Sequence, residues 1–236
     1  MEFDIIEIRP NVFHVDYPTQ YQLTSTFMRL QEFYESPYDD IRGHFFTHEQ
    51  YMDRYAEDRG KMSYFTDWSG FNVPSSAISL FMDKFGYSLN VKENALMVPL
   101  MSMVAPRLEA NPNYRYYLIG TYGMKTDTIN HELCHAYWFI DPEYRQQKIA
   151  LIEKHYPMGS EEYKSLADGL IELGYADDEE ILDDEIQAFA STKGTASLIN
   201  TLGLNDDFVV PKDFKNHFNE YDESIRKEFN EGVLNE

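Results

Sequence analysis

The sequence His131-Glu132-Leu133-Cys134-His135 constrains the fold of this chain more than any other feature, because its spacing suits a helix. Residues four positions apart lie one above the other on the same face of a helix. Two neutral imidazoles at this spacing can bind one Zn²⁺, and a Glu beside the first His points toward the side where a metal-bound water would sit. The motif therefore predicts a metal-binding helix.

The residues around the motif support this interpretation. Tyr114 to Tyr122 is rich in aromatic and β-branched residues and predicts a strand that Gly123 ends. Thr126 or Asp127 can cap a helix that runs through the motif to about Phe139. Apolar residues surround this helix on nearly all sides: Ile129, Leu133, Ala136, Tyr137 and Phe139. A buried helix with His, Glu and His on one face needs a partner for them, and a metal ion provides one.

Over residues 114–140 the chain resembles the zincin metallopeptidases, in which the motif helix lies beside an edge strand and forms the floor of the active-site cleft. The resemblance implies an α+β, mostly helical fold with a small mixed sheet beside the motif helix. It also implies that His131 and His135 bind Zn²⁺ and that Glu132 is the general base for the metal-bound water. The strand around Tyr117 to Tyr122 would then be the sheet edge, to which an extended peptide could add.

Catalytic zinc usually has three protein ligands, and Glu185 is the favoured third ligand. Residues Asp178 to Thr192 predict a helix with an apolar stripe, and Glu185 falls inside that stripe. A carboxylate on a core-facing stripe requires a cation, whereas its acidic neighbours, Asp183 and Asp184 among them, are expected to be solvated. The sequence from Glu185 to Ala190, E-x-x-A-F-A, is similar to the second motif of gluzincins and of ImmA/IrrE-type peptidases.

Asp141 is the alternative third ligand. It lies ten residues after His131, where a metzincin-like pattern places its third ligand. That pattern needs a Gly at position 138, and this chain has Trp138. Asp141 also precedes Pro142, a pair that is typical of the first residues of a new helix.

The resemblance of Glu185 to the gluzincin ligand has two departures of its own. The interval from His135 to Glu185 is 50 residues, longer than is usual in ImmA/IrrE-type peptidases, and Phe189 stands where thermolysin-like enzymes keep a carboxylate that supports a metal ligand.

The length, charge and cysteine content limit the remaining choices. A chain of 236 residues suits one domain, 1–236, or an N-terminal lobe 1–110 with a metal-binding helical lobe 111–236. Its formal net charge of −21 argues against binding nucleic acid or anionic membranes, and otherwise indicates a solvated acidic surface. A peptide or protein substrate is what the resemblance to zincins implies. One Cys, no secretory-type opening and no apolar run of about 18 residues together predict a cytoplasmic protein. The oligomeric state is not predicted.

Periodicity and capping residues predict the other elements. Two strands are expected at residues 3–7 and 12–17, and residues 86–113 are expected to be mixed because three prolines interrupt them. Helices are expected at 19–35, 47–58, 75–85, 142–155, 161–173, 178–192 and 211–232.

A second metal site at His44 and His48 is disfavoured, because Thr47 caps a helix between them. Four side chains could donate a hydrogen bond to a developing oxyanion: Tyr137, His155, Tyr175 and His217, with His155 favoured. The sequence thus predicts a zinc-dependent hydrolase, most consistent with an intracellular metallopeptidase. The alternative is a zincin-fold metal-binding or interaction protein that does not turn over peptides.

Overall fold

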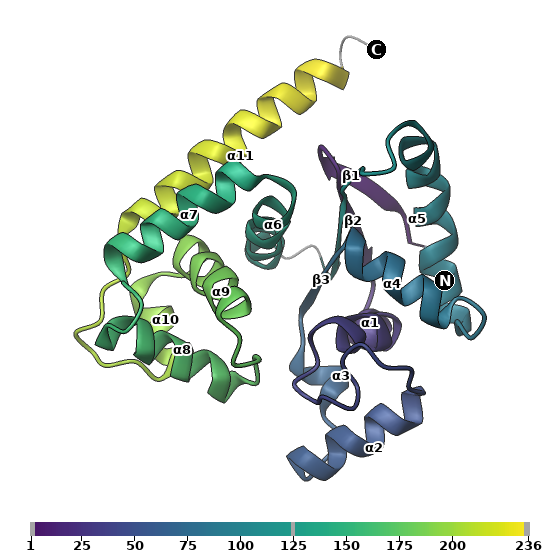
Figure 1. Cartoon of the computed structure of the whole chain (residues 1–236), viewed down its shortest axis with the longest axis horizontal. Helices are drawn as coiled ribbons and strands as arrows, with labels where there is room; N and C mark the ends of the chain where they lie inside the picture. The colour runs from purple at the N-terminus through teal and green to yellow at the C-terminus, as the bar shows by residue number, and fades with distance from the viewer. Residues whose placement is uncertain (1–2, 124–125, 234–236) are drawn as a thin grey trace. The chain divides into compact units, whose positions relative to one another are not determined.

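The computed structural model describes residues 3–123 and 126–233. The chain divides into two compact units, residues 1–129 and 130–236. The boundary falls after Ile129 and not near residue 110, because the strand that precedes the motif pairs with the sheet of the first unit. The fold is mostly helical with one small mixed sheet, as predicted (Figure 1).

The first unit contains a four-stranded sheet in the order β1-β2-β4-β3. Its strands are β1 (Ile5–Arg9), β2 (Val12–Tyr17), β3 (Gly70–Pro74) and β4 (Tyr117–Tyr122). Strand β4 is parallel to β2 and antiparallel to β3, so it lies inside the sheet. The expectation that this strand forms the sheet edge is wrong. Its backbone groups pair with strands on both sides, so no peptide can add to it.

Helices of the first unit cover one face of the sheet. Helix α1 (Gln20–Glu35) contacts β2, β3 and β4, and α4 (Ser75–Phe85) packs beside it against β3 (Figure 1). Thr19 caps α1 by accepting a hydrogen bond from the backbone N–H of Gln22. Leu23 and Phe27 then recur at helical spacing and are fully buried. Helices α2 (His48–Arg59) and α3 (Tyr64–Asp67) also belong to this unit.

Helix α5 (Val91–Ala110) corrects the prediction of a mixed segment at residues 86–113. It continues through Pro99 and Pro106, although an interior proline costs a helix about 3 kcal/mol or more. Both prolines lie on the exposed face, where water can bond the carbonyl groups that they leave unpaired. The inner face buries apolar side chains at helical spacing: Leu96, Met97, Leu100 and Val104. Their burial outweighs the cost of the prolines.

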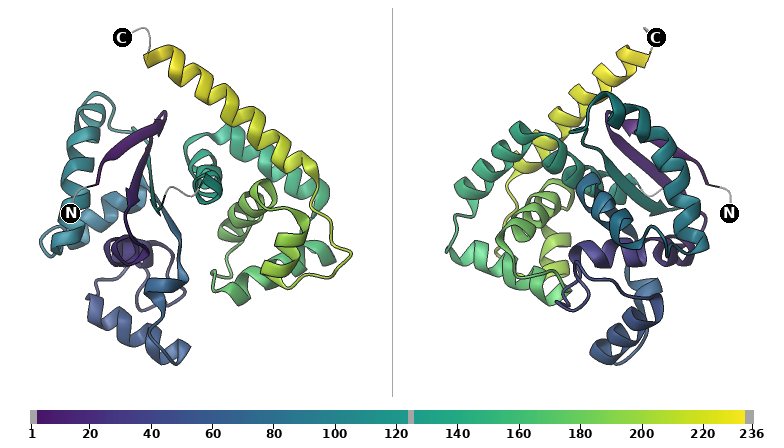
Figure 2. Two further views of the ribbon diagram at one scale, coloured as in Figure 1. Left: turned by 180° about the vertical axis from the view of Figure 1, so that it is seen from behind. Right: turned by 45° about the vertical axis from the view of Figure 1, so that its right-hand side comes forward.

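The second unit is a group of helices: α6 (Thr126–Ile140, whose first turn belongs to the first unit), α7 (Pro142–His155), α8 (Glu161–Leu173), α9 (Glu179–Thr192), α10 (Thr195–Leu202) and α11 (Lys212–Val233). The boundaries predicted for α7 and α8 are confirmed, and α9 begins one residue later than predicted; Asp141, Ser160 and Asp178 are the N-caps of the three helices. Helices α7 and α11 run side by side (Figures 1 and 2). No helix in the described ranges is long and apolar enough to cross a membrane.

Lys148 joins three of these helices. Its side chain, on α7, is fully buried. The Nζ donates to the Ser191 hydroxyl on α9 at 2.8 Å and to the Phe214 carbonyl on α11 at 2.9 Å. Burial lowers the pKa of Lys148 from its usual 10.5 to about 8. Lys148 therefore links α7 to α9 and α11. Keeping its side chain charged in the interior costs free energy, and this cost disappears at a pH where the buried lysine loses its proton.

We expect the wild type to gain stability relative to a Lys148→Met variant as the pH rises from 8 to 10.5. Over this window the unfolded lysine keeps a proton that the folded lysine has lost, so the gain approaches about 3 kcal/mol. Urea unfolding of both proteins at the two ends of the window measures it. If the free energies of unfolding of the wild type and of Lys148→Met change equally between the two pH values, the lowered pKa of Lys148 is contradicted.

Candidate metal centre

Helix α6 presents both histidines of the motif on one face. The Nε2 atoms of His131 and His135 lie 3.4 Å apart, and the two rings meet nearly edge to face. The side chain of His135 is 2% exposed and that of His131 is 15% exposed. Residues one turn apart thus point two ring nitrogens at a single position near the surface of the helix.

Helix α9 brings Glu185 to the same position. Its Oε1 lies 3.6 Å from Nε2 of His135, and its Oε2 lies 3.7 Å from Nε2 of His131. The ligand atoms of the three residues all fall within 4.8 Å of one another. Within residues 3–123 and 126–233 this is the one group of three or more His, Cys, Asp or Glu side chains arranged in this way.

The three side chains fit a zinc ion. Zn²⁺ binds histidine nitrogen at about 2.0–2.1 Å, so two donors at a tetrahedral angle lie about 3.4 Å apart. The observed separations of 3.4, 3.6 and 3.7 Å approach this value. Oε2 of Glu185 is also buried and has no hydrogen-bond partner among the described residues. A buried carboxylate oxygen without a partner is costly, and a metal ion would satisfy it.

Charges within the cluster hold Glu185 ionised. Burial alone would raise its pKa, but His135, His131 and a hydrogen bond from Tyr175 bring the pKa below its usual value. Burial likewise would lower the pKa of His135, but Asp184 and Glu185 raise it well above the usual value. His135 therefore binds a proton tightly in the absence of metal, and a metal ion would have to displace that proton.

Glu132 lies beside the cluster without belonging to it. Its side chain is buried, and its charge helps to raise the pKa of His135. It is not among the three residues whose ligand atoms converge. A carboxylate next to a metal site that is not itself a ligand is placed to exchange protons with a metal-bound water.

The alternative ligand Asp141 is engaged elsewhere. Its Oδ1 accepts the backbone N–H of Glu143 at 2.8 Å, as the N-cap of α7, and its Oδ2 accepts the Tyr221 hydroxyl. His48, from the disfavoured second pair, faces Asn90 and Glu93. Neither Asp141 nor His48 joins a group of potential metal ligands in the described part of the chain.

One of the four proposed hydrogen-bond donors lies against the cluster. Tyr175, between α8 and α9, donates to the Glu185 carboxylate. The favoured donor His155 instead pairs with Asp213 at 2.9 Å, near the end of α7. Tyr137 donates to Asp222, and the ring of His217 contacts Gln147. The effect of Tyr175 on the pKa of Glu185 therefore favours Tyr175 over His155 as the donor.

Sequence reasoning missed Asp184, which it treated as solvated. Its Oδ1 lies 3.0 Å from Nδ1 of His135. The one sequence signal for Asp184 is its spacing. The small residues Ala188 and Ser191 follow it at helical intervals, so they share its side of the helix, and both are buried. Asp184 thus lies at the border of the buried face of α9.

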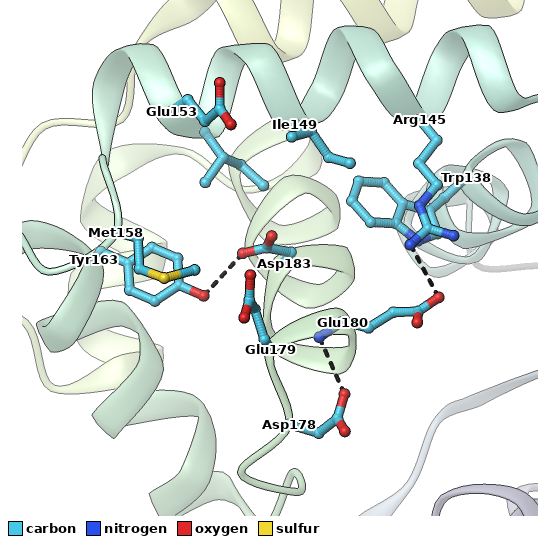
Figure 3. Close-up of a pocket in the computed structure, with 11 residues that line it drawn as sticks. Trp138, Arg145, Ile149, Glu153, Met158, Tyr163, Asp178, Glu179, Glu180 and Asp183 are labelled. Atoms are coloured by element: carbon cyan, nitrogen blue, oxygen red, sulfur yellow. Dashed lines mark hydrogen bonds and ion pairs between the residues drawn. The ribbon is translucent and has the colours of Figure 1, made fainter.

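The other face of α9 borders a pocket of about 460 Å³ (Figure 3). Asp183 lies there and accepts the Tyr163 hydroxyl at 2.9 Å, while Glu180 pairs with Arg145 at 3.0 Å. The consecutive residues Asp183 and Asp184 therefore have different partners: Asp183 faces this pocket and Asp184 faces His135.

No known family model, curated protein or solved structure matches this chain. The resemblance to zincins stays a prediction from the motif.

Proposed function

We propose that this protein is a zinc-dependent hydrolase of the zincin type and that it cleaves peptide bonds. The observation that carries the proposal is the convergence of the ligand atoms of His131, His135 and Glu185 within 4.8 Å. In addition, the buried Oε2 of Glu185 has no hydrogen-bond partner among the described residues. Two imidazoles and one carboxylate are a donor set of catalytic zinc sites.

The number of donors supports a catalytic role over a structural one. Structural zinc sites usually have four protein ligands, whereas catalytic sites have three and leave a position for water. The group in the described residues has three members. Glu132, beside the group but outside it, matches the needs of a general base. A purely structural site has no use for such a carboxylate.

Each residue then has a defined role. When bound, zinc polarises the scissile carbonyl and lowers the pKa of its bound water to about 7. His131, His135 and Glu185 would hold the ion. Glu132 accepts the proton of the attacking water at its carboxylate and delivers it to the leaving amine nitrogen. Tyr175 is our proposed donor to the oxygen of the scissile carbonyl as negative charge develops there.

A Tyr175→Phe variant is expected to lower kcat by about 10²-fold while KM changes little, because an oxyanion donor acts mainly in the transition state. The matched control is Tyr163→Phe, which removes a hydroxyl bonded to Asp183 on the other face of α9. Steady-state kinetics on one identified peptide substrate measures both variants. Equal kcat values in the two variants would rule out Tyr175 as the donor.

The proposal is tested with a library of proteome-derived peptides and mass spectrometry of new termini. We expect cleavage that a zinc chelator stops and that added Zn²⁺ restores. A protein that binds zinc but generates no new termini would overturn the hydrolase proposal. It would favour the alternative, a zincin-fold metal-binding or interaction protein without peptidase turnover.

A further inference from the structure

The ring of His135 lies between two consecutive carboxylates of α9. Asp184 Oδ1 approaches Nδ1 at 3.0 Å, and Glu185 Oε1 approaches Nε2 at 3.6 Å. The two nitrogens of an imidazole point in different directions, so one residue can bind each of them. Glu185 is thus on the metal side of the ring, and Asp184 is on the side that a metal would leave free.

Asp184 is itself held in place. The same Oδ1 accepts a hydrogen bond from Nε2 of Gln187 at 2.9 Å. Gln187 is fully buried, and its Oε1 faces the hydroxyl of the buried Tyr144 at 3.4 Å. A buried amide with both ends occupied has little freedom to turn. The carboxylate of Asp184 therefore has a fixed direction toward His135.

The other histidine of the motif lacks such a partner. Nδ1 of His131 faces the Thr192 hydroxyl at the longer distance of 3.4 Å. That hydroxyl donates its own hydrogen to the Ala188 carbonyl at 2.7 Å, so it can only accept from the ring. A neutral hydroxyl at 3.4 Å restrains a ring less than a carboxylate at 3.0 Å. The two imidazoles are thus held unequally.

We propose that Asp184 is a positioning residue for the metal centre. It accepts the Nδ1–H of His135, fixes the tautomer whose Nε2 is free to bind metal, and orients the ring toward Glu185. Gln187 in turn fixes Asp184. A carboxylate that accepts from a metal-bound histidine raises the basicity of that ligand, and its loss typically weakens metal binding about 10–100-fold. This inference rests on the proposed zinc site, but not on peptidase turnover.

The test compares Zn²⁺ affinities, measured by competition with a chelating dye, in the wild type and three variants. Asp184→Ala is expected to weaken binding about 10–100-fold. Asp184→Asn retains an oxygen that can accept from Nδ1, so it should recover part of that loss. The control Asp183→Asn removes the same charge from the adjacent residue, which faces Tyr163, and should bind zinc like the wild type.

A second readout reports the ring itself. In the zinc-bound wild type, nitrogen NMR is expected to show His135 with hydrogen on Nδ1 and metal on Nε2. In Asp184→Ala this preference should weaken, and the absorption bands of the Co²⁺-substituted protein should shift. Asp184→Asn should keep both signatures closer to the wild type. A merely structural role of Asp184 would change stability and leave these signatures in place.

The outcomes separate this inference from the proposed function. If the wild type binds zinc, and Asp184→Ala matches Asp183→Asn in affinity and in the His135 signals, the positioning role is overturned while the zinc site stands. If the wild type binds no zinc, the proposed function fails and this inference fails with it. Zinc affinity lost in Asp184→Ala and partly restored in Asp184→Asn would support the role.

Discussion

A Glu132→Gln variant is expected to lose turnover and keep its zinc. Glutamine has nearly the same shape as glutamate but cannot accept the proton of the attacking water, so kcat should fall by about 10²–10⁴-fold. Zinc content should stay at the wild-type level, because Glu132 is outside the group of three ligand residues. Steady-state cleavage of one identified peptide, with metal analysis of the same sample, measures both quantities.

The matched control for this variant is Glu172→Gln. It makes the same chemical change at an exposed position on α8 and should leave both cleavage and zinc content unchanged. Undiminished cleavage by Glu132→Gln would remove the general-base role. Loss of zinc in that variant would instead mean that Glu132 is needed to hold the metal.

The second large effect is expected at Glu185. Replacing it by Gln or Ala removes the charged ligand and leaves two imidazoles. Zinc affinity should therefore fall by more than the roughly 10–100-fold lost when a residue that only hydrogen-bonds to a metal ligand is changed. Competition with a chelating dye measures the affinity, and thermal unfolding of the metal-free proteins shows whether each variant folds.

Asp141→Asn is the control for Glu185, since it alters the alternative third ligand. Asn caps helices about as well as Asp, so α7 should keep its N-cap. Zinc affinity should then equal that of the wild type. The opposite pattern, with zinc lost in Asp141→Asn and kept in Glu185→Gln, would show that the metzincin-like ligand set is correct.

The helices around the metal centre could be predicted because their ends depend on local chemistry. Ser160 and Asp178 accept backbone N–H groups one turn ahead, and Gly174 closes α8 in a left-handed conformation. These interactions involve residues close in sequence. Each leaves a signal that can be read from the sequence alone.

The errors concern features that depend on distant partners. Strand β3 was missed because it is short, begins with Gly70 and ends with Pro74, and is held by pairing with β4. The internal position of β4 follows from the same long-range pairing. Helix α5 continues through two prolines because packing of its inner apolar face against the unit overrides the local preference of proline to end a helix.

In the metal centre, too, some features follow from local sequence and others depend on distant partners. The spacing of His131 and His135 and the apolar stripe around Glu185 selected the three residues whose ligand atoms converge. The contacts of Asp184 and Tyr175 depend on how α9 is rotated and where the loop before it lies. Sequence periodicity does not determine the rotation of α9 or the path of that loop precisely enough to predict which side chains touch.

The central claim is that His131, His135 and Glu185 bind zinc, and metal analysis of the wild-type protein tests it most directly. The untagged chain should be equilibrated with Zn²⁺, freed of excess ion and assayed for zinc and protein. We predict one zinc per chain. A folded protein that retains no zinc would contradict the metal centre and, with it, the proposed hydrolase.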